Sequence, residues 1–307
     1  GQTLAMVGES GCGKTTIARM LMRLHEPSSG RIEVDGQDIT QARDKKSIKQ
    51  WHTRIQMIFQ DPFASLNPAK SVQNIIGRAI TLHFPELSKN EVETRVHDLL
   101  TQVGLTPPSD FTGKHPAQLS GGQRQRIVIA RALAVQPEIL VADEPTSMLD
   151  VSIGIDILNL LNELKESKHL TMLYITHNLA SARYIADDMV VLYAGNAVEY
   201  GRVDDIIEAP YHPYTVLLLN STPEPFRKEN VEFQASEDLP DLTVEQIGCP
   251  FVLRCPVAMP RCHTQIPDDY AIGERQVKCF LYEGRTMEDR PHITITIYME
   301  EDQHEQT

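Results

Sequence analysis

The sequence contains no apolar run approaching the ~20 residues that a membrane-spanning helix requires. Positive charge is also in short supply, because 29 Lys and Arg stand against 42 Asp and Glu, for a net charge of −13. An acidic chain of this kind is a poor general binder of nucleic acid, so we expect no nucleic-acid partner. Cysteine is rare as well: there are five in 307 residues, and four of them fall after position 248.

The length and composition nevertheless allow a substantial core. A chain of 307 residues with 41% hydrophobic residues is long enough for one large domain and a smaller one. It opens at Gly1 directly on the apolar run Thr3–Val7, without an initiator Met, so we expect the natural N-terminus and further strands to lie upstream.

The segment Gly8–Thr15 reads GESGCGKT and organises the chain. Its glycines let successive backbone N–H groups point at phosphate oxygens, Lys14 can reach the β- and γ-phosphates, and the Thr15 hydroxyl can hold Mg²⁺. The apolar run before it predicts a buried strand, and Thr16–Met22 predicts a helix whose N-terminus faces the phosphates. The residues expected to contact a nucleotide here are Gly8, Glu9, Ser10, Gly11, Cys12, Gly13, Lys14, Thr15 and Thr16.

Polar residues follow three further apolar segments. The segments predict strands at Ile55–Phe59, Ile139–Ala142 and Leu170–Thr176. Asp143 can hold Mg²⁺, and Glu144 can polarise an attacking water as general base. Gln60 can hold Mg²⁺ or that water, and His177 can contact the γ-phosphate and orient Glu144. The competing interpretation is a solvated strand-end side chain for Gln60 taken alone, and a structural role for His177 taken alone.

A second anion-binding cradle is predicted near position 120. Apolar residues recur at helical spacing from about Val72 to Ile129, and Ile127–Val135 predicts a helix. Small residues at a helix start offer bare N–H groups and the positive end of the helix dipole. The residues expected to form this cradle are Ser120, Gly121, Gly122 and Gln123.

These motifs together resemble the nucleotide-binding subunits of ABC transporters over almost all of the first 210 positions. The resemblance rests on GESGCGKT at Gly8–Thr15, Gln60, LSGGQ at Leu119–Gln123, Ile139–Glu144, Ser147–Asp150 and His177. It implies an α/β fold: a phosphate-loop ABC-type ATPase core with an inserted helical subdomain and a small Cys-containing C-terminal appendage. It implies ATP and Mg²⁺ as cofactors and adds Asp150 to the nucleotide-binding residues. Asn178 departs from the family, which usually has Asp at this position.

The resemblance narrows to the oligopeptide/dipeptide importer branch. It rests there on Ile58–Pro68, on HPYT at His212–Thr215, and on four late cysteines separated by five, six and sixteen residues. These cysteines are Cys249, Cys255, Cys262 and Cys279. Members of the branch carry a [4Fe–4S] cluster on four such cysteines, which implies an iron–sulfur site here; zinc, or thiols without a ligand, are the alternatives.

The branch also implies partners. ATP is expected to be sandwiched between this chain and a second ABC ATPase subunit, in a heterodimer. Two transmembrane permease subunits and an extracytoplasmic substrate-binding protein complete the expected importer, which places this chain peripherally on the cytoplasmic face of the cell membrane. The competing functions are import of another cargo, such as nickel or glutathione, and a soluble ABC-type ATPase of a non-transport complex.

The expected domains follow from the same patterns. Residues 1–202 form the nucleotide-binding domain, with the helical subdomain at about 65–130. Residues 203–285 form the C-terminal region, and 286–307 an acidic tail. A Gly195–Asn196 turn between Met189–Tyr193 and Ala197–Glu199 predicts a hairpin. Ile293–Ile297 alternates like a strand.

Overall fold

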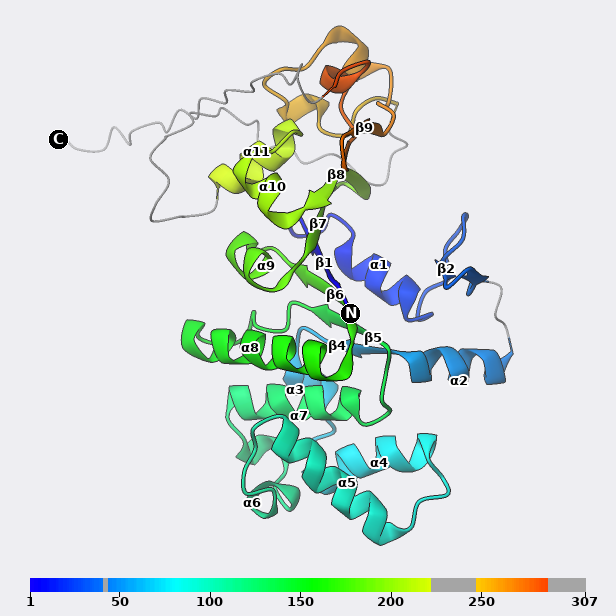
Figure 1. Cartoon of the computed structure of the whole chain (residues 1–307), viewed down its shortest axis with the longest axis vertical. Coiled ribbons are helices and arrows are strands. Elements are labelled where there is room, and N and C mark those ends of the chain that lie inside the picture. Colours follow the sequence, from blue (N-terminus) through cyan, green and yellow to red (C-terminus); the bar gives the residue numbers. More distant parts are fainter. Residues whose placement is uncertain (41–43, 222–246, 287–307) are drawn as a thin grey trace, which may run out of the picture. The chain divides into compact units, whose positions relative to one another are not determined.

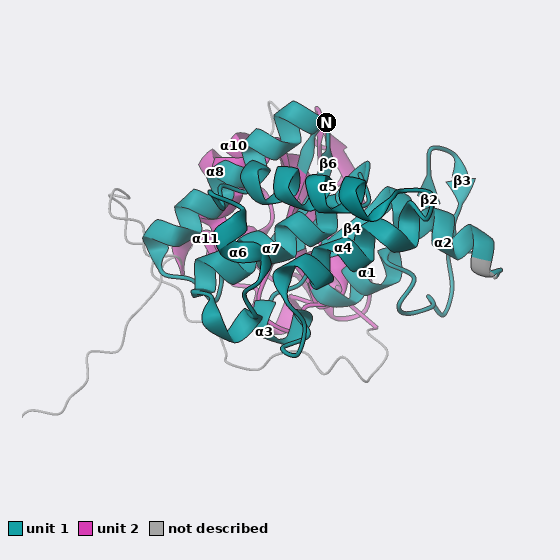
Figure 2. Cartoon of the chain, turned by 90° about the horizontal axis from the view of Figure 1, so that it is seen from below, with its two compact units in different colours: residues 1–3, 15–175 teal, residues 4–14, 176–307 magenta. Residues whose placement is uncertain are grey.

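The computed structural model describes residues 1–40, 44–221 and 247–286. These residues fall into two compact units, one from the ranges 1–3 and 15–175 and one from the ranges 4–14, 176–221 and 247–286 (Figure 2). The expected strand at Ile293–Ile297 lies outside the described residues, as does most of the predicted acidic tail.

The first unit contains three parallel strands. These are β4 (Ile55–Ile58), β5 (Ile139–Asp143) and β6 (Thr171–Thr176). Ile55 pairs with Ile139, and Ile139 pairs with Thr171. The apolar runs therefore form the strands that the sequence predicts, because continuous burial is what parallel strands require. The neighbouring elements are α1 (Lys14–Leu21), β2 (Glu33–Val34), β3 (Gln37–Asp38), α2 (Lys45–Arg54) and α8 (Val151–Lys168).

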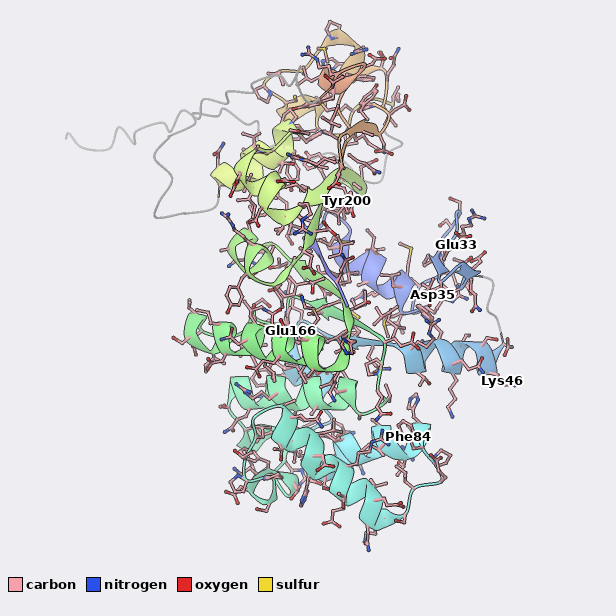
Figure 3. The ribbon with its side chains drawn as sticks, viewed as in Figure 1. Glu33, Asp35, Lys46, Phe84, Glu166 and Tyr200 are labelled. Atoms are coloured by element: carbon pink, nitrogen blue, oxygen red, sulfur yellow. The ribbon has the colours of Figure 1, made fainter. Side chains whose placement is uncertain are left out.

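A group of helices between β4 and β5 confirms the predicted helical character of that segment. Its elements are α3 (Pro62–Ser65), α4 (Val72–His83), α5 (Lys89–Gln102), α6 (Ser109–Thr112), a 3₁₀ turn at Pro116–Gln118 and α7 (Gly121–Leu133). Figure 1 shows α4 and α5 beside α7. Ile76 and Ile80 of α4 and Val96 of α5 are fully buried, which is the apolar stripe that the helical spacing indicates. At the end of α4, the Phe84 ring (Figure 3) lies 4.1 Å below the guanidinium carbon of Arg95.

The helix α7 begins six residues before the predicted start at Ile127. Ser120 and Gln123 form a capping box, in which each side chain accepts a hydrogen bond from the backbone N–H of the other residue. The two intervening glycines have poor helix propensity, but the capping box satisfies N–H groups that the first turn leaves without partners. The positive end of the helix therefore lies within LSGGQ.

The second unit is built on a mixed sheet with the order β1-β7-β8-β10-β9. The strand β1 (Thr3–Val7) pairs in parallel with β7 (Asp188–Tyr193), which forms the predicted hairpin with β8 (Asn196–Arg202). Its turn lies at Ala194 and Gly195, one residue earlier than predicted. A second hairpin, β9 (Tyr270–Ile272) and β10 (Arg275–Val277), continues the sheet, with Gln276 paired to Tyr200 (Figure 3). The C-terminal region thus extends the same sheet that carries the phosphate loop.

Short helices complete the second unit. They are α9 (Leu179–Ile185), α10 (Val203–Glu208), α11 (Pro213–Asn220) and 3₁₀ turns at Val252–Arg254, Pro260–His263 and Phe280–Tyr282. None of the helices in the described part of the chain combines the length and apolar character needed to cross a membrane.

A buried ion pair joins the hairpin β9–β10 to the rest of the second unit. The Glu199 carboxylate is fully buried and accepts hydrogen bonds from the backbone N–H groups of Tyr211 (2.8 Å) and His212 (2.9 Å) and from the guanidinium of Arg275. The same guanidinium lies 3.5 Å from the centre of the Tyr211 ring. A buried carboxylate needs such partners, because desolvation alone raises the pKa of Glu199.

We predict that Arg275→Ala lowers the free energy of unfolding by about 3–5 kcal/mol, because it leaves the Glu199 carboxylate buried without its cation. Arg183→Ala is the matched control. Arg183 bonds Asp204 and Glu208 at 3.0 Å on the surface, so its loss should cost less than about 1 kcal/mol. Chemical denaturation followed by circular dichroism measures both. Equal destabilisation by the two substitutions would contradict the assignment.

Candidate active site

The phosphate loop encloses the ammonium group of Lys14, whose residue is only 6% exposed. Its Nζ donates hydrogen bonds to the carbonyl oxygens of Gly8 (2.7 Å) and Glu9 (2.8 Å) and lies 3.7 Å from Cys12 Sγ. Burial raises the pKa of the Cys12 thiol despite the nearby cation, so the thiol stays neutral. The loop therefore presents a net positive centre, as phosphate binding requires.

Gly8 is required by a close backbone approach. A Cβ atom at this position would lie 2.2 Å from the Leu192 carbonyl oxygen and 2.8 Å from Cys12 Sγ. The loop is tied to the hairpin on the other side as well, because the Gly195 N–H donates to the Cys12 carbonyl oxygen at 2.9 Å. The end of β7 and the turn after it therefore fix the curvature of the loop.

Two of the three residues predicted to bind Mg²⁺, Thr15 and Asp143, meet in the first unit, whereas the Gln60 amide bonds Glu144 and its role as a Mg²⁺ ligand remains a prediction. Thr15 Oγ1, in the first turn of α1, donates to Asp143 Oδ2 at the end of β5, with 3.0 Å between the atoms. The Asp143 residue is 3% exposed. A hydroxyl and a carboxylate are hard oxygen donors, so the pair fits Mg²⁺, which neutralises charge on the phosphates when bound.

Glu144 is held in a conformation that L-residues rarely adopt. Its φ angle is 45°, and its N–H donates to the Ile175 carbonyl oxygen of the neighbouring strand at 2.9 Å. The Gln60 amide, just after β4, donates through Nε2 to Glu144 Oε2 at 2.8 Å. A left-handed conformation costs roughly 1–2 kcal/mol for a residue with a Cβ, and such strain is concentrated at functional sites. The first unit thus brings Gln60 and Glu144 together at one sheet edge.

The LSGGQ segment lies where the sequence predicts, at the N-terminus of α7 (Figure 1). Gly122 is required by packing, because a Cβ there would lie 2.7 Å from Ile153 Cγ2 of α8. The side chain of Asp150 caps α8 by accepting from the Ile153 N–H at 3.0 Å. The nucleotide contacts expected of Ser120 and Asp150 remain predictions, since both side chains are used here as helix caps.

His177 belongs to the second unit and is exposed directly after β6. The next residue, Asn178, caps α9 by accepting the Ser181 N–H through its side-chain oxygen at 3.1 Å. Asn and Asp serve equally well as N-caps, which explains why Asn is compatible with this position. The contact expected between His177 and Glu144 stays a prediction, because these residues lie in different units.

The iron–sulfur expectation is wrong. The four late cysteines line one small cavity together with Phe251 and Phe280, but their side chains do not form a metal site. Across residues 1–40, 44–221 and 247–286, no group of three or more Cys, His, Asp or Glu side chains could hold a metal ion, which removes the support for zinc as well. Burial raises the pKa of the thiols of Cys255 and Cys279 to about 12, so both are protonated at neutral pH.

Two contacts to the loop were not predicted. The Glu9 N–H donates to the Tyr214 hydroxyl at 2.9 Å, and the Glu9 carboxylate pairs with Arg254. Tyr214 lies in the HPYT segment, whose recurrence in one branch of the family is the only signal that the sequence offers. Nothing in the local pattern around Arg254 indicates a contact with residue 9.

A phosphate loop, a partly buried Thr–Asp pair and a strained Glu at a strand end define a nucleoside triphosphatase. Residues 1–147 match the family described as ABC transporter, and residues 198–262 match the oligopeptide/dipeptide transporter C-terminal region. The chain is 44% identical over 288 residues to the oligopeptide transport ATP-binding protein AppF of Bacillus subtilis, covering 92% of this chain and 86% of that protein. It is 42% identical to the di/tripeptide transport ATP-binding protein DppF of Pseudomonas aeruginosa, covering 91% and 85%.

Solved structures agree with these matches. An ADP- and phosphate-bound dimer of the ATP-binding cassette MJ0796 has a TM-score of 0.59 and 30% identity, over 66% of this chain and 85% of that one. CbiO1 of Clostridium perfringens, part of an ABC transporter complex, has a TM-score of 0.60 and 28% identity, over 68% and 80%. The chain belongs to the ATP-binding subunits of ABC transporters, in the oligopeptide/dipeptide branch, and it is an ATP-hydrolysing enzyme that uses Mg²⁺.

We predict that Gly8→Ala raises the dissociation constant for ATP at least about tenfold, because the added methyl group must displace the Leu192 carbonyl and reshape the loop. Gly113→Ala is the matched control, since no atom lies within 4 Å of its added Cβ and its φ of −82° suits any residue. Isothermal titration with ATP measures both. Unchanged affinity in Gly8→Ala would contradict the close-approach argument.

Proposed function

We propose that this chain is the ATP-hydrolysing subunit that energises uptake of di- and oligopeptides through a membrane ABC importer. The observation that carries the proposal is that one chain combines a match to the ABC transporter family over residues 1–147 with a C-terminal region of the oligopeptide/dipeptide type over residues 198–262. The names of the similar proteins, which include oligopeptide and di/tripeptide transport ATP-binding proteins, support peptides as cargo.

ATP is sandwiched between two ATPase subunits in this proposal. Gly8–Thr15 of one subunit surrounds the phosphates, and the N-terminus of α7 in the other subunit faces the γ-phosphate. Support comes from the two anion cradles themselves: one is centred on a buried ammonium group and the other is a capped helix N-terminus. Because both cradles attract the same charge, ATP binding favours the closed pair and loss of the γ-phosphate releases it.

Hydrolysis uses Thr15 at the start of α1 together with residues at the ends of the strands. Asp143 and Thr15 hold Mg²⁺, Glu144 takes the proton of the attacking water, and Gln60 fixes the orientation of the Glu144 carboxylate. The Gln60–Glu144 hydrogen bond and the strained Glu144 backbone support these roles. His177 contacts the γ-phosphate, and its exposed position after β6 leaves it accessible for that contact.

The partners follow from the same function. The second ATPase is a similar but distinct subunit, which makes a heterodimer. Two permease subunits form the membrane path, and an extracytoplasmic binding protein delivers the peptide. The chain binds the permeases peripherally at the cytoplasmic face of the membrane. The names of the similar proteins, as ATP-binding proteins of peptide transport, support this arrangement.

We predict that Glu144→Gln lowers kcat for ATP hydrolysis by about 10²–10⁴-fold and leaves the dissociation constant for ATP within about threefold, because it removes the base but retains both cradles. Glu138→Gln is the control. Glu138 lies directly before β5, at the end opposite Glu144, and pairs with Arg54 on the surface. The kcat of Glu138→Gln should therefore stay within about twofold of wild type. Steady-state hydrolysis and equilibrium binding separate the two effects. Undiminished kcat in Glu144→Gln would rule out Glu144 as the base.

The importer itself is tested by affinity purification of the tagged full chain from gently solubilised membranes of its own host. We expect two permeases and a second ABC ATPase to co-purify with the chain, and we expect the genes of these proteins to lie next to the gene of a peptide-binding protein. A chain recovered without membrane partners would contradict the proposed function, even if it hydrolyses ATP.

A further inference from the structure

The phosphate loop is held at Glu9 by two residues from the far end of the chain. The Tyr214 hydroxyl accepts the Glu9 N–H at 2.9 Å across 205 positions. Arg254 forms a bidentate pair with the Glu9 carboxylate across 245 positions, through Nη1–Oε2 (2.8 Å) and Nη2–Oε1 (2.9 Å). All three residues belong to the second unit.

The Arg254–Glu9 pair is sheltered from water, and shelter strengthens a charged hydrogen bond. The Arg254 side chain is 11% exposed and that of Glu9 is 31% exposed. The guanidinium carbon lies 5.7 Å from the Tyr193 ring centre and 5.9 Å from that of Phe251. The hydrogen bonds to the Glu9 carboxylate raise the pKa of Arg254 further above its already high value, so the guanidinium stays charged at any physiological pH.

The aromatic residues behind the pair form one cluster. Tyr193 at the end of β7 contacts Tyr214 with ring centres 4.5 Å apart and Phe251 with ring centres 5.1 Å apart, and Tyr214 and Phe251 are 5.5 Å apart. Burial raises the pKa of Tyr214, which keeps its hydroxyl neutral. The cluster fixes the directions from which Tyr214 and Arg254 reach the loop.

The four-cysteine segment sets the position of Arg254. This residue ends the 3₁₀ turn that stands between Cys249 and Cys255. Phe251, at the start of the same turn, lines the cavity that the four thiols share. The first and third cysteines of this segment are joined by a hydrogen bond, in which the Cys249 N–H donates to the Cys262 carbonyl oxygen at 2.8 Å. The packing of the cysteines therefore determines where the guanidinium lies.

All three polar groups of Glu9 are engaged: the N–H by Tyr214, the carbonyl by the Lys14 ammonium at 2.8 Å, and the carboxylate by Arg254. A displacement of Glu9 consequently moves one of the oxygens that hold Lys14. We propose that Arg254 and Tyr214 are positioning residues for ATP, through which the C-terminal region sets the geometry of the phosphate loop. By linkage, ATP binding stabilises the C-terminal region in return. This coupling concerns ATP and not the cargo, so it does not depend on peptide transport.

The first test measures ATP affinity and turnover in variants of the full chain. Arg254→Ala should raise the dissociation constant and the KM for ATP about tenfold and leave kcat within about twofold, because it disturbs binding and not the hydrolytic residues. The dissociation constant and the KM of Arg254→Lys should lie between those of the wild type and Arg254→Ala, because an ammonium group keeps the charge but cannot make the bidentate pair. Arg261→Ala is the matched control: Arg261 lies in the same region, pairs with Glu283 and covers the Phe280 ring at 4.2 Å.

A double-mutant cycle with Glu9→Ala separates the effect of losing the Arg254–Glu9 pair from a non-specific loss of structure. The double variant should bind ATP no more weakly than Arg254→Ala, because the second substitution removes an interaction already lost. Additive losses of ATP affinity, or an equal loss in Arg261→Ala, would overturn the proposal.

If circular dichroism shows that Arg254→Ala does not fold, Tyr214→Phe provides the test. It removes only the hydroxyl and should weaken ATP binding about threefold, and unchanged affinity would overturn the proposal.

The second test measures the reciprocal effect by hydrogen–deuterium exchange. Saturating ATP should slow exchange of backbone amides in residues 249–262 about threefold or more in wild type and leave it unchanged in Arg254→Ala. Equal exchange with and without ATP in the wild-type chain would refute the coupling. Both tests use ATP alone, so failure of peptide import would leave their outcome intact.

Discussion

A buried positive charge at the centre of the phosphate loop determines much of the surrounding structure. The Lys14 ammonium lies out of water, and the carbonyls of Gly8 and Glu9 accept its hydrogen bonds. For those carbonyls to turn inward, the loop must pass against Leu192 closely enough that only glycine fits at position 8. The hairpin β7–β8 and the C-terminal region then hold the loop in this shape from outside. The loop around the buried cation is thus contacted by Leu192 and Gly195 of the hairpin segment and by Tyr214 and Arg254 of the C-terminal region.

The first unit places hydroxyl, amide and carboxylate groups at one edge of its sheet. The parallel strands β4 and β5 end beside one another, so Gln60 and Glu144, which follow them, meet although they are far apart in sequence. Asp143 and Thr15 form one pair there, and Gln60 and Glu144 form another. The starts of α7 and α8 are fixed by the side chains of Ser120 and Asp150, which cap these helices.

The sequence predicts the elements of this site well because each has a local cause. The strand Thr3–Val7, the hairpin turn and the helical stretch all follow from apolar periodicity and turn residues. The early start of α7 is less predictable, because the Ser120–Gln123 capping box outweighs the poor helix propensity of Gly121 and Gly122. The strands β9 and β10 were not predicted, because three residues are too few to show the alternation of apolar and polar side chains that indicates a strand.

Long-range contacts explain what the sequence does not predict. The spacing of the four cysteines indicates that they can meet, and they do line one cavity, but spacing carries no information on whether the sulfurs converge around a metal. The Glu9–Arg254 pair likewise joins residues with no shared local pattern. In both cases the outcome depends on the packing of Phe251 and its neighbours, which only the folded chain shows.

Peptide-dependent turnover of ATP tests the central claim most directly. The chain, assembled in lipid vesicles with its permeases and partner ATPase, would be assayed for ATP hydrolysis with its binding protein, with and without a set of di- to pentapeptides. The account predicts that peptide-loaded binding protein accelerates hydrolysis and that peptide accumulates in the same vesicles. Hydrolysis that responds instead to a metal complex or glutathione, or to no cargo at all, would contradict it.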